Sequence, residues 1–350
     1  MRVLVTGGAG FVGSNLAVRI AEAFAGARVV AMDNLYRRGS ECTLPRLERH
    51  GVHFHEGDVR EPGHFPDEGF DFLIECSAEP SVLAGLSGTP DYMVQTNLMG
   101  AYNCLERARA WKAGFLFLSS SRVYPIATLE AHPWREEASR YAWADGAGPG
   151  ISPRGVSEDV PMNGARSLYG WSKLSAEQLV EEYRAAFGLA AVVNRCGMIA
   201  GPWQFGKVDQ GVVSHWVQAH LFGRPLQYMG YGGKGKQVRD VLHVDDLGDL
   251  VLEQLREFAR WDGWLGNVAG GQENSVSLLE LTQLCEDASG RKTRVGASME
   301  QRPADLRIFI GDCSRIFART SWRPKRNVQA TVQDLTRWVG EARSQLEAIA

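Results

Sequence analysis

A glycine-rich turn near the start of the chain joins an apolar, strand-like segment to a segment with helical periodicity. Residues 2–6 are strand-like, and residues 10–24 place apolar side chains at helical spacing. Between them glycine occupies positions 7, 10 and 13. Glycine allows a tight turn, close packing of a helix on a strand, and approach of a diphosphate to the backbone. The turn therefore predicts the first strand and helix of a dinucleotide-binding unit.

The next apolar segment, residues 28–33, ends in Asp33, 20 residues after Gly13. A carboxylate at this point of such a unit bonds to the hydroxyl groups of an adenosine ribose and repels a 2′-phosphate. We therefore expect NAD rather than NADP. Asp58, which follows another candidate strand, is expected beside the adenine, although an acid at a strand end can equally cap a turn.

Strand-like and helix-like segments alternate through the first half of the chain. The further candidate strands are residues 52–56, 70–75, 114–119 and 190–195, and the helical patterns are residues 96–110 and 167–187. Alternation at this spacing predicts a parallel sheet with helices on both faces, which is the doubly wound Rossmann arrangement of the α/β class.

The regular alternation ends near Cys196, where longer loops and a glycine-rich stretch begin. Because 350 residues are enough for two lobes, we expect a smaller, discontinuous α/β lobe that binds the substrate. The expected division gives residues 1–195 and about 238–265 to the NAD-binding lobe, and about 196–237 and 266–350 to the substrate lobe. Residues 131–163 are rich in glycine, proline and aromatic side chains, and are expected to form a long loop that folds over the substrate pocket.

The composition argues against several classes of function. The 38 lysine and arginine residues nearly balance the 41 aspartate and glutamate residues, so we expect no nucleic-acid partner and no membrane partner. Apolar runs such as residues 189–193 are too short for a membrane span, and no signal-peptide core precedes the first strand. The 6 cysteines form no C-x-x-C pair, and the histidines show no convincing metal-ligand spacing. We therefore expect a cytoplasmic protein with reduced thiols and no metal.

Tyr169 and Lys173 lie four residues apart in a helical pattern, which places both side chains on one face of the helix. A free tyrosine has a pKa of about 10, so a phenol that acts as a base at neutral pH needs a cation beside it. Lys173 supplies that charge. A cluster of serines, residues 119–121, lies at the carboxyl end of the strand 114–119 and is expected to place a hydroxyl beside the tyrosine, although a serine cluster can also cap a helix.

Together these features resemble the extended short-chain dehydrogenase/reductase superfamily, and within it the NAD-dependent nucleotide-sugar epimerases and dehydratases. The resemblance covers nearly the whole chain, because the motifs follow one another in the family's order. It implies NAD as the cofactor and Ser120, Tyr169 and Lys173 as the catalytic residues. It implies cofactor contacts at Gly7, Gly10, Phe11, Val12, Gly13, Asp33, Asn34, Asp58, Val59, Ser77, Ala78, Asn97, Tyr169 and Lys173.

The second half resembles the family's substrate-binding segments. Arg239 and Arg302 match two arginines that hold the diphosphate of a nucleotide sugar, and Asp305 matches an acid for the nucleotide ribose. Residues 201–211 and 235–240 are similar to the CDP-paratose 2-epimerases, also called CDP-tyvelose epimerases. The resemblance implies substrate contacts at Ser121, Arg122, Gln204, Asp209, Gln210, Lys236, Gln237, Arg239, Arg302 and Asp305.

Two short segments depart from the pattern of these relatives. Residues 75–78 read Glu-Cys-Ser-Ala in place of the common His-Leu-Ala-Ala, and Ser121-Arg122 replaces an Asn-Lys pair. Dehydratases of the family carry Asp-Glu at the latter position as an acid–base pair, so the sequence argues against dehydration. Residues 230–236 have the glycine spacing of an ATPase phosphate-binding loop, but Gln237 stands where such a loop needs serine or threonine.

The expected reaction is the epimerisation of a nucleotide sugar. Tyr169 takes a hydroxyl proton while a hydride passes to NAD, the keto-sugar reorients, and the hydride returns to its opposite face. The resemblance favours C2 of a CDP-sugar. A C4 epimerase of a UDP-hexose is the alternative in the same class, and a non-catalytic, NAD-bound sensor or scaffold is the alternative in another class. The family's habit of pairing two helices per subunit implies a homodimer.

Overall fold

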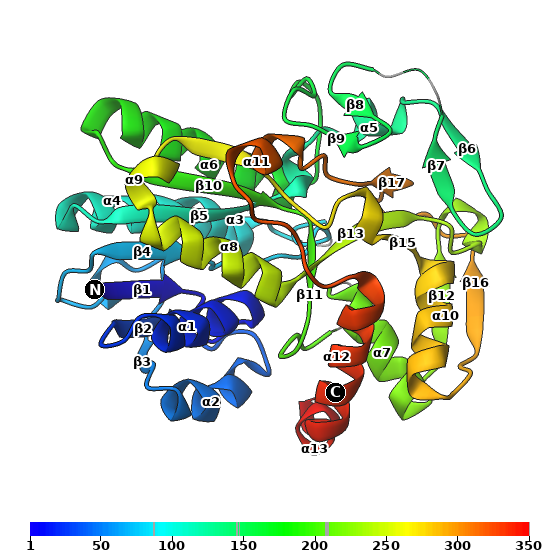
Figure 1. Ribbon diagram of the computed structural model, residues 1–350, viewed down its shortest axis with the longest axis horizontal. Helices are drawn as coiled ribbons and strands as arrows, with labels where there is room; N and C mark the ends of the chain where they lie inside the picture. Colours follow the sequence, from blue (N-terminus) through cyan, green and yellow to red (C-terminus); the bar gives the residue numbers. More distant parts are fainter. Residues whose placement is uncertain (87, 145, 147, 207–209, 350) are drawn as a thin grey trace.

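The computed structural model describes residues 1–86, 88–144, 146, 148–206 and 210–349. Its centre is a parallel sheet with the strand order β14-β10-β5-β4-β1-β2-β3 (Figure 1). The strands of this sheet are β1 (Arg2–Thr6), β2 (Arg28–Asp33), β3 (His53–Glu56), β4 (Phe72–Glu75), β5 (Gly114–Ser120), β10 (Ala191–Cys196) and β14 (Trp264–Val268). The order reverses between β1 and β4, where doubly wound sheets hold their ligands at the carboxyl ends of the strands. The predicted Rossmann fold is confirmed.

Helices cover both faces of this sheet. They are α1 (Phe11–Ala23), α2 (Leu44–Arg49), α3 (Asp91–Val94), α4 (Gly100–Trp111), α6 (Leu168–Phe187), α8 (Val244–Arg256), α9 (Phe258–Trp261) and α11 (Ser314–Arg319). Because strand side chains alternate between faces, Val3 and Val5 of β1 pack with α1 and α8, whereas Leu4 packs with α4 and α6. The pattern predicted at 96–110 begins as a π-helical turn, η3 (Gln95–Met99), and continues as α4.

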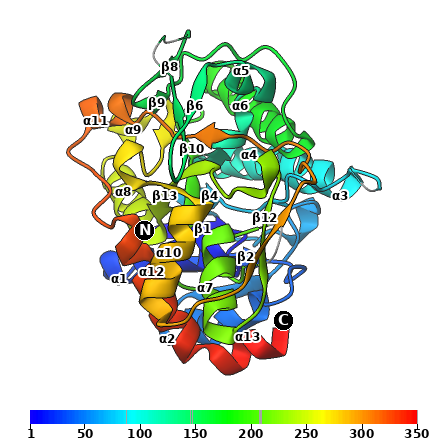
Figure 2. The same ribbon diagram turned by 90° about the vertical axis from the view of Figure 1, so that its right-hand side faces the viewer.

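The second lobe is built on a small sheet in the order β11-β13-β15, with a further strand, β17, paired to β13. Its elements are β11 (Met198–Ala200), α7 (Val212–Phe222), β12 (Leu226–Met229), β13 (Val238–His243), β15 (Ser275–Ser277), α10 (Leu278–Ser289), β16 (Val295–Ser298), β17 (Ile308–Phe309), α12 (Val328–Glu341) and α13 (Arg343–Ile349). α7, α10 and α12 pack together around an apolar cluster that includes Trp216, Leu335 and Trp338 (Figure 2).

The chain crosses between the lobes more than once. After β13 it returns to the first lobe as α8, and it then enters the central sheet as the outer strand β14. β13 itself pairs with strands of the second lobe, although it lies in the stretch 238–265 expected for the first. The division of the chain at the expected residues stays a prediction.

Residues 131–163 fold into two hairpins rather than an open loop. The hairpins are β6 (Trp134–Glu136) with β7 (Tyr141–Trp143), and β8 (Ile151–Ser152) with β9 (Gly155–Val156). Both are fastened to the second lobe: Arg140 Nε donates to Glu280 Oε1 at 2.8 Å, and the Val156 amide donates to the Ile310 carbonyl at 2.7 Å. A cavity lies at the carboxyl ends of the central strands, and no described residue of this segment lines it. The prediction that the segment folds over the substrate pocket is therefore wrong. Its aromatic rings pack against one another instead.

The remaining elements are short. They are η1 (Ser40–Thr43), η2 (Pro62–His64), η4 (Ser121–Val123), α5 (Ile126–Glu130), η5 (Tyr231–Gly233) and η6 (Gln272–Asn274). Within the described ranges no helix combines the length and the apolar character that a membrane crossing needs. The same ranges hold no cluster of three or more histidine, cysteine or acidic side chains placed to bind a metal ion.

Candidate functional site

A cavity of about 1030 Å³ runs from the carboxyl ends of the central strands into the second lobe. The structure brings most of the predicted site residues to its walls, namely Gly7, Gly10, Phe11, Val12, Gly13, Asp33, Asn34, Val59, Ser77, Ala78, Ser120, Ser121, Arg122, Tyr169, Lys173, Gln204, Gln210, Gln237, Arg239, Arg302 and Asp305. Asp58, Asn97 and Lys236 are not part of the lining, and Asp209 lies outside the described residues.

The backbone at the glycine turn has no room for side chains. Gly7 has a φ of +61°, and a Cβ atom on Gly13 would lie 2.1 Å from the Gly7 carbonyl oxygen. A Cβ atom on Gly8 would lie 2.6 Å from Cα of Ala31. α1 begins here with neither a side-chain cap nor an acidic residue in its first turn, so its first N–H groups stay available to an anion in the cavity. The turn therefore fits a diphosphate.

Asp33 ends β2 on the cavity wall beside this turn. Its carboxylate accepts hydrogen bonds from the backbone N–H groups of Ala9 at 3.1 Å and Leu35 at 2.9 Å. Burial raises the pKa of Asp33, and these hydrogen bonds oppose the rise. The backbone thus fixes the carboxylate on the wall where an adenosine ribose is expected.

The Asp58 carboxylate is hydrogen-bonded to neighbouring side chains and does not line the cavity. It accepts hydrogen bonds from the Asn34 side-chain amide at 2.8 Å and from Arg60 Nη2 at 2.7 Å. Burial alone would raise the pKa of Asp58, but the hydrogen bonds from Arg60 and Asn34 outweigh it and lower the pKa to about 2. Asp58 orients Asn34, whereas the adjacent Val59 reaches the cavity.

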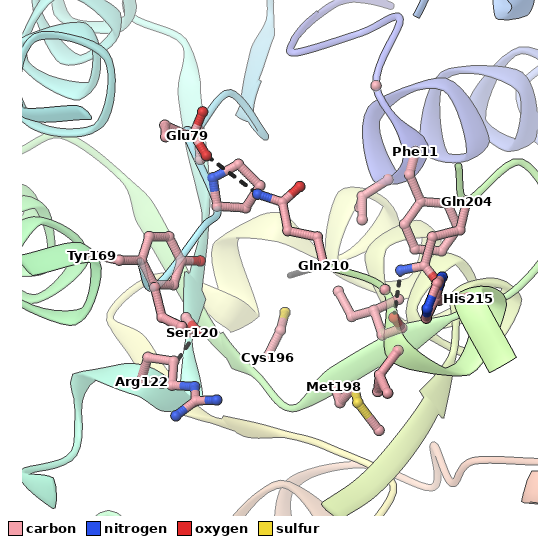
Figure 3. A pocket seen from close by; sticks show the side chains of 18 of the residues that line it. Phe11, Glu79, Ser120, Arg122, Tyr169, Cys196, Met198, Gln204, Gln210 and His215 are labelled. Atoms are coloured by element: carbon pink, nitrogen blue, oxygen red, sulfur yellow. Dashed lines mark hydrogen bonds between the residues drawn. The ribbon is translucent and has the colours of Figure 1, made fainter. Parts of the chain in front are cut away.

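Ser120 and Tyr169 approach the cavity from two different elements. Ser120 ends β5, and its hydroxyl accepts a hydrogen bond from the Arg122 amide at 3.2 Å. Tyr169 lies in the first turn of α6, which Ser167 caps by accepting a hydrogen bond from the Gly170 amide at 3.1 Å. Figure 3 shows the phenol oxygen pointing into the pocket next to Ser120.

Lys173 lies one helical turn after Tyr169 and is only 3% exposed. Its ammonium group lies 4.6 Å from the centre of the Phe117 ring and 3.6 Å from a carboxylate oxygen of Glu75. Burial raises the pKa of Glu75, and Lys173 together with a hydrogen bond from Ser77 opposes that rise. The lysine therefore sits in an apolar, water-poor position on the cavity wall, with one acidic neighbour.

Asn97 supports this site from the π-helical turn. Its Nδ2 atom donates to Ser172 Oγ at 3.0 Å and to the Glu79 carbonyl at 3.1 Å, while its Oδ1 atom accepts from the Glu79 amide at 2.8 Å. Asn97 thus ties the loop after β4 to α6, beside Lys173.

The predicted substrate residues divide into two groups. Arg239 and Asp305 face each other on the cavity wall, with 2.7 Å between Nη2 and Oδ1. Gln210 donates to Glu79 Oε1 at 3.2 Å across the pocket (Figure 3). In contrast, the ammonium group of Lys236 pairs with Glu136 at 2.8 Å away from the cavity.

Two glutamines of the cavity wall form side-chain hydrogen bonds within the protein, although Oε1 of Gln237 has no hydrogen-bond partner among the described residues. Gln204 donates to the Ile199 carbonyl at 3.1 Å and accepts from the Ser214 hydroxyl at 2.6 Å. Gln237 donates to the Met229 carbonyl at 2.6 Å. Their amides therefore brace the wall.

The family model described as "NAD dependent epimerase/dehydratase family" matches residues 3–263. The chain belongs to this family. A CDP-paratose 2-epimerase from Salmonella typhi is 31% identical over 97% of this chain and 99% of its own length. A UDP-glucose 4-epimerase from Erwinia amylovora is 28% identical, and the match covers 97% of each chain. Among solved structures, UDP-glucose 4-epimerase from Thermus thermophilus in complex with NAD has a TM-score of 0.75 at 25% identity, over 98% of this chain and 100% of that chain.

Membership of the NAD dependent epimerase/dehydratase family makes the chain an enzyme with NAD as its cofactor. The residues present fit that group, since the glycine turn accommodates a diphosphate and Asp33 offers a carboxylate to an unphosphorylated ribose.

Replacing Asp33 by asparagine should narrow the preference for NAD over NADP. The change removes the charge that repels a 2′-phosphate. It keeps one of the two oxygens that accept hydrogen bonds, one from the Ala9 amide and the other from the Leu35 amide. Thermal protection by each cofactor measures the preference, and Asp67→Asn, on the surface, is the matched control. If the wild-type protein were protected equally by NAD and NADP, the role of Asp33 would be refuted.

Glu75 is a functional candidate to which the sequence assigned no role. It appeared only as a departure from the family pattern, and the one available signal was an acidic residue at the end of an apolar strand. In the structure it is 1% exposed and pairs with Lys173. A buried carboxylate there offsets part of the positive field that Lys173 exerts on the phenol.

Replacing Glu75 by glutamine should therefore move the acid limb of the turnover–pH profile to lower pH, by on the order of one unit. The sign follows because removing the negative charge strengthens the positive potential that favours the phenolate. Turnover measured across pH tests this, with Glu56→Gln, at the exposed end of β3, as the control. An unchanged profile would mean that Glu75 carries no charge while the base titrates.

Proposed function

We propose that the chain interconverts two nucleotide sugars that differ in configuration at C2, with CDP-paratose and CDP-tyvelose as the pair. The observation that carries the proposal is one continuous cavity that is lined both by the trio Ser120, Tyr169 and Lys173 and by the pair Arg239 and Asp305. The choice of C2 and of CDP is supported by the similarity to the CDP-paratose 2-epimerase from Salmonella typhi.

In the proposed reaction Tyr169 removes the proton of the C2 hydroxyl group, and Ser120 hydrogen-bonds to the same oxygen. The positive charge of Lys173 stabilises the phenolate that this requires. NAD, held by the glycine turn and Asp33, would supply the hydride acceptor for C2 and the hydride donor for the opposite face of the keto-sugar, and Tyr169 returns the proton to the oxygen. Between the two transfers the sugar turns in the pocket while Arg239 and Arg302 keep hold of the diphosphate.

The residues after Ser120 support epimerisation over dehydration. An elimination needs an acid and a base beside the sugar. Ser121 and Arg122 occupy the two positions that follow the catalytic hydroxyl, and both line the cavity. Neither side chain is a carboxylate.

A panel of nucleotide sugars tests the proposal. CDP-paratose, CDP-tyvelose and UDP-glucose are incubated with the NAD-loaded protein, and the products are identified by NMR. We expect inversion at C2 of the CDP-sugars with no net release of NADH. Inversion of UDP-glucose at C4 alone would favour the other candidate, which the Erwinia amylovora relative supports. Binding without turnover would favour a sensor or scaffold.

We further propose that the protein acts as a homodimer in the cytoplasm. Apolar side chains stay exposed along the two neighbouring helices α4 and α6 and the turn before α4: Met99, Tyr102, Trp171 and Phe187. A second copy of the chain that presents the same face would cover them.

A further inference from the structure

Arg122 places a positive charge on the cavity wall two residues after Ser120. Its side chain is half-buried, and Nη1 donates to the carbonyl oxygen of Ala304 at 2.9 Å. Ala304 has a φ of +57°, and it belongs to the segment that carries Arg302 and Asp305. Among the described residues, no carboxylate lies within 4 Å of the guanidinium group, and the carbonyl that accepts its hydrogen bond is neutral.

The position of this charge relative to the phenol is fixed by backbone packing. The Arg122 amide is bonded to Ser120 Oγ, and a Cβ atom on Gly170 would lie 2.1 Å from the Arg122 carbonyl oxygen. The backbone of Arg122 therefore rests directly against the helical turn that carries Tyr169. Figure 3 shows Arg122 on the same side of the pocket as Tyr169 and Ser120.

Several arginines line the cavity, and they act on different parts of it. Burial, Arg224 and Arg302 lower the pKa of His215, so Arg302 acts on the His215 side of the cavity. Figure 3 places His215 opposite Tyr169. Arg122 interacts electrostatically with Tyr169 instead. Arg122 is thus, with Lys173, a cation at the reacting end.

Arg239 also lines the cavity, and it lies close enough to Arg122 to repel it electrostatically. Burial and Arg239 together lower the pKa of Arg122 to about 10, which leaves the guanidinium charged at neutral pH. Arg239 is itself paired with Asp305, so the two together carry no net charge. A nucleotide sugar carries two negative charges on its diphosphate, and balancing both requires two cations beyond this neutral pair. The proposed function assigns Arg302 to the diphosphate, and Arg122 is in place to supply the second charge.

We propose that Arg122 binds the phosphate group attached to the sugar and that this contact holds C2, rather than C4, at Tyr169. C2 is bonded directly to C1, which carries that phosphate, whereas C4 lies across the ring. If the phosphate is held next to the Tyr169 phenol, C2 lies within reach of the phenol oxygen, whereas C4 lies too far from it. The proposal rests on the proposed function for the identity of the ligand.

Nucleotides without sugar test the phosphate contact. CMP carries only the phosphate next to the ribose, and CDP adds the second. With NAD-loaded protein in a calorimeter, Arg122→Gln should weaken CDP about tenfold or more and leave CMP unchanged. Arg239→Gln should weaken both, and Arg135→Gln, at an exposed pair with Glu137, should weaken neither. Equal affinities of wild type and Arg122→Gln for CDP would overturn the proposal.

Two additions keep the result interpretable. UMP and UDP are measured in the same way. If the natural substrate carries uridine instead of cytidine, UMP and UDP will bind more tightly than CMP and CDP. The ratio of the diphosphate affinity to the monophosphate affinity still reports on Arg122 in either case. If Arg122→Gln loses NAD or unfolds, Arg122→Lys takes its place. One ammonium cannot reproduce the planar fork that holds Ala304 and a phosphate together. We therefore expect a smaller, but still selective, loss of CDP affinity, and equal loss of CMP and CDP would refute the contact.

The placement of C2 needs a kinetic readout. At saturating CDP-sugar, Arg122→Gln should turn over at least about tenfold more slowly than wild type, because the bound sugar is no longer held with C2 at the phenol. Full turnover at saturation would show that Arg122 contributes affinity alone, and would refute its role in choosing the carbon. If wild type itself fails to invert C2, the proposed function fails, whatever the CMP and CDP affinities show.

Discussion

Replacing Tyr169 by phenylalanine should leave the protein folded and loaded with NAD, and should lower turnover by a factor of roughly 10²–10⁴. The ring stays in place at the start of α6, so the packing of the helix on the sheet is kept. Only the phenol oxygen is lost, and with it the group that takes and returns the hydroxyl proton. Lys173 and Ser120 cannot substitute for it, because the lysine is buried beside Glu75 and the serine is a weak base.

Turnover of the nucleotide sugar, NAD content and the melting temperature are measured on the same preparation. Tyr102→Phe, on the exposed side of α4, removes a phenol oxygen elsewhere and is the matched control. Turnover close to that of wild type in Tyr169→Phe would remove this residue from the mechanism.

Replacing Glu177 by alanine should lower the free energy of unfolding by about 3–5 kcal/mol. Glu177 lies on the same face of α6 as Tyr169 and Lys173, and it is 3% exposed. Its carboxylate accepts from Arg195 Nη2 at 2.7 Å and from the Ser119 hydroxyl at 2.5 Å. The alanine variant leaves the Arg195 charge buried in the sheet without its partner, which is the costly case for an ion pair.

Chemical unfolding measures this loss. Glu347→Ala breaks an exposed pair with Arg343 and should cost less than about 1 kcal/mol. Changing Glu177 and Arg195 together to methionine should recover much of the stability, because no charge is then left unpaired. A loss below about 1 kcal/mol in Glu177→Ala would show that water or another group compensates Arg195.

The sequence predicted those parts of the fold that local spacing encodes. The glycines before α1 and the acid that ends β2 are close in sequence, so their joint geometry follows from the chain order. β14 was not predicted because Gly266 and Asn267 interrupt its apolar run. It becomes a strand through pairing with β10, a partner far away in the sequence.

Side-chain partners that depend on tertiary contacts were beyond the reach of sequence patterns. Lys236 was expected at the substrate, but Glu136 from a hairpin about a hundred residues earlier takes its ammonium group. The Gln204 amide hydrogen-bonds to the Ile199 carbonyl and to the Ser214 hydroxyl. Glu75 acquires a role only because folding places it next to Lys173. In each case the deciding contact is set by tertiary structure.

The central claim is that a hydride leaves C2 of the sugar and returns to the same carbon. The direct measurement uses CDP-paratose with deuterium at C2, the NAD-loaded protein and ordinary water, with the product examined by NMR and mass spectrometry. We predict that the epimer formed keeps the deuterium at C2. Replacement of the deuterium by hydrogen from the solvent would contradict the account, because it would show removal of a proton from C2 in place of hydride transfer.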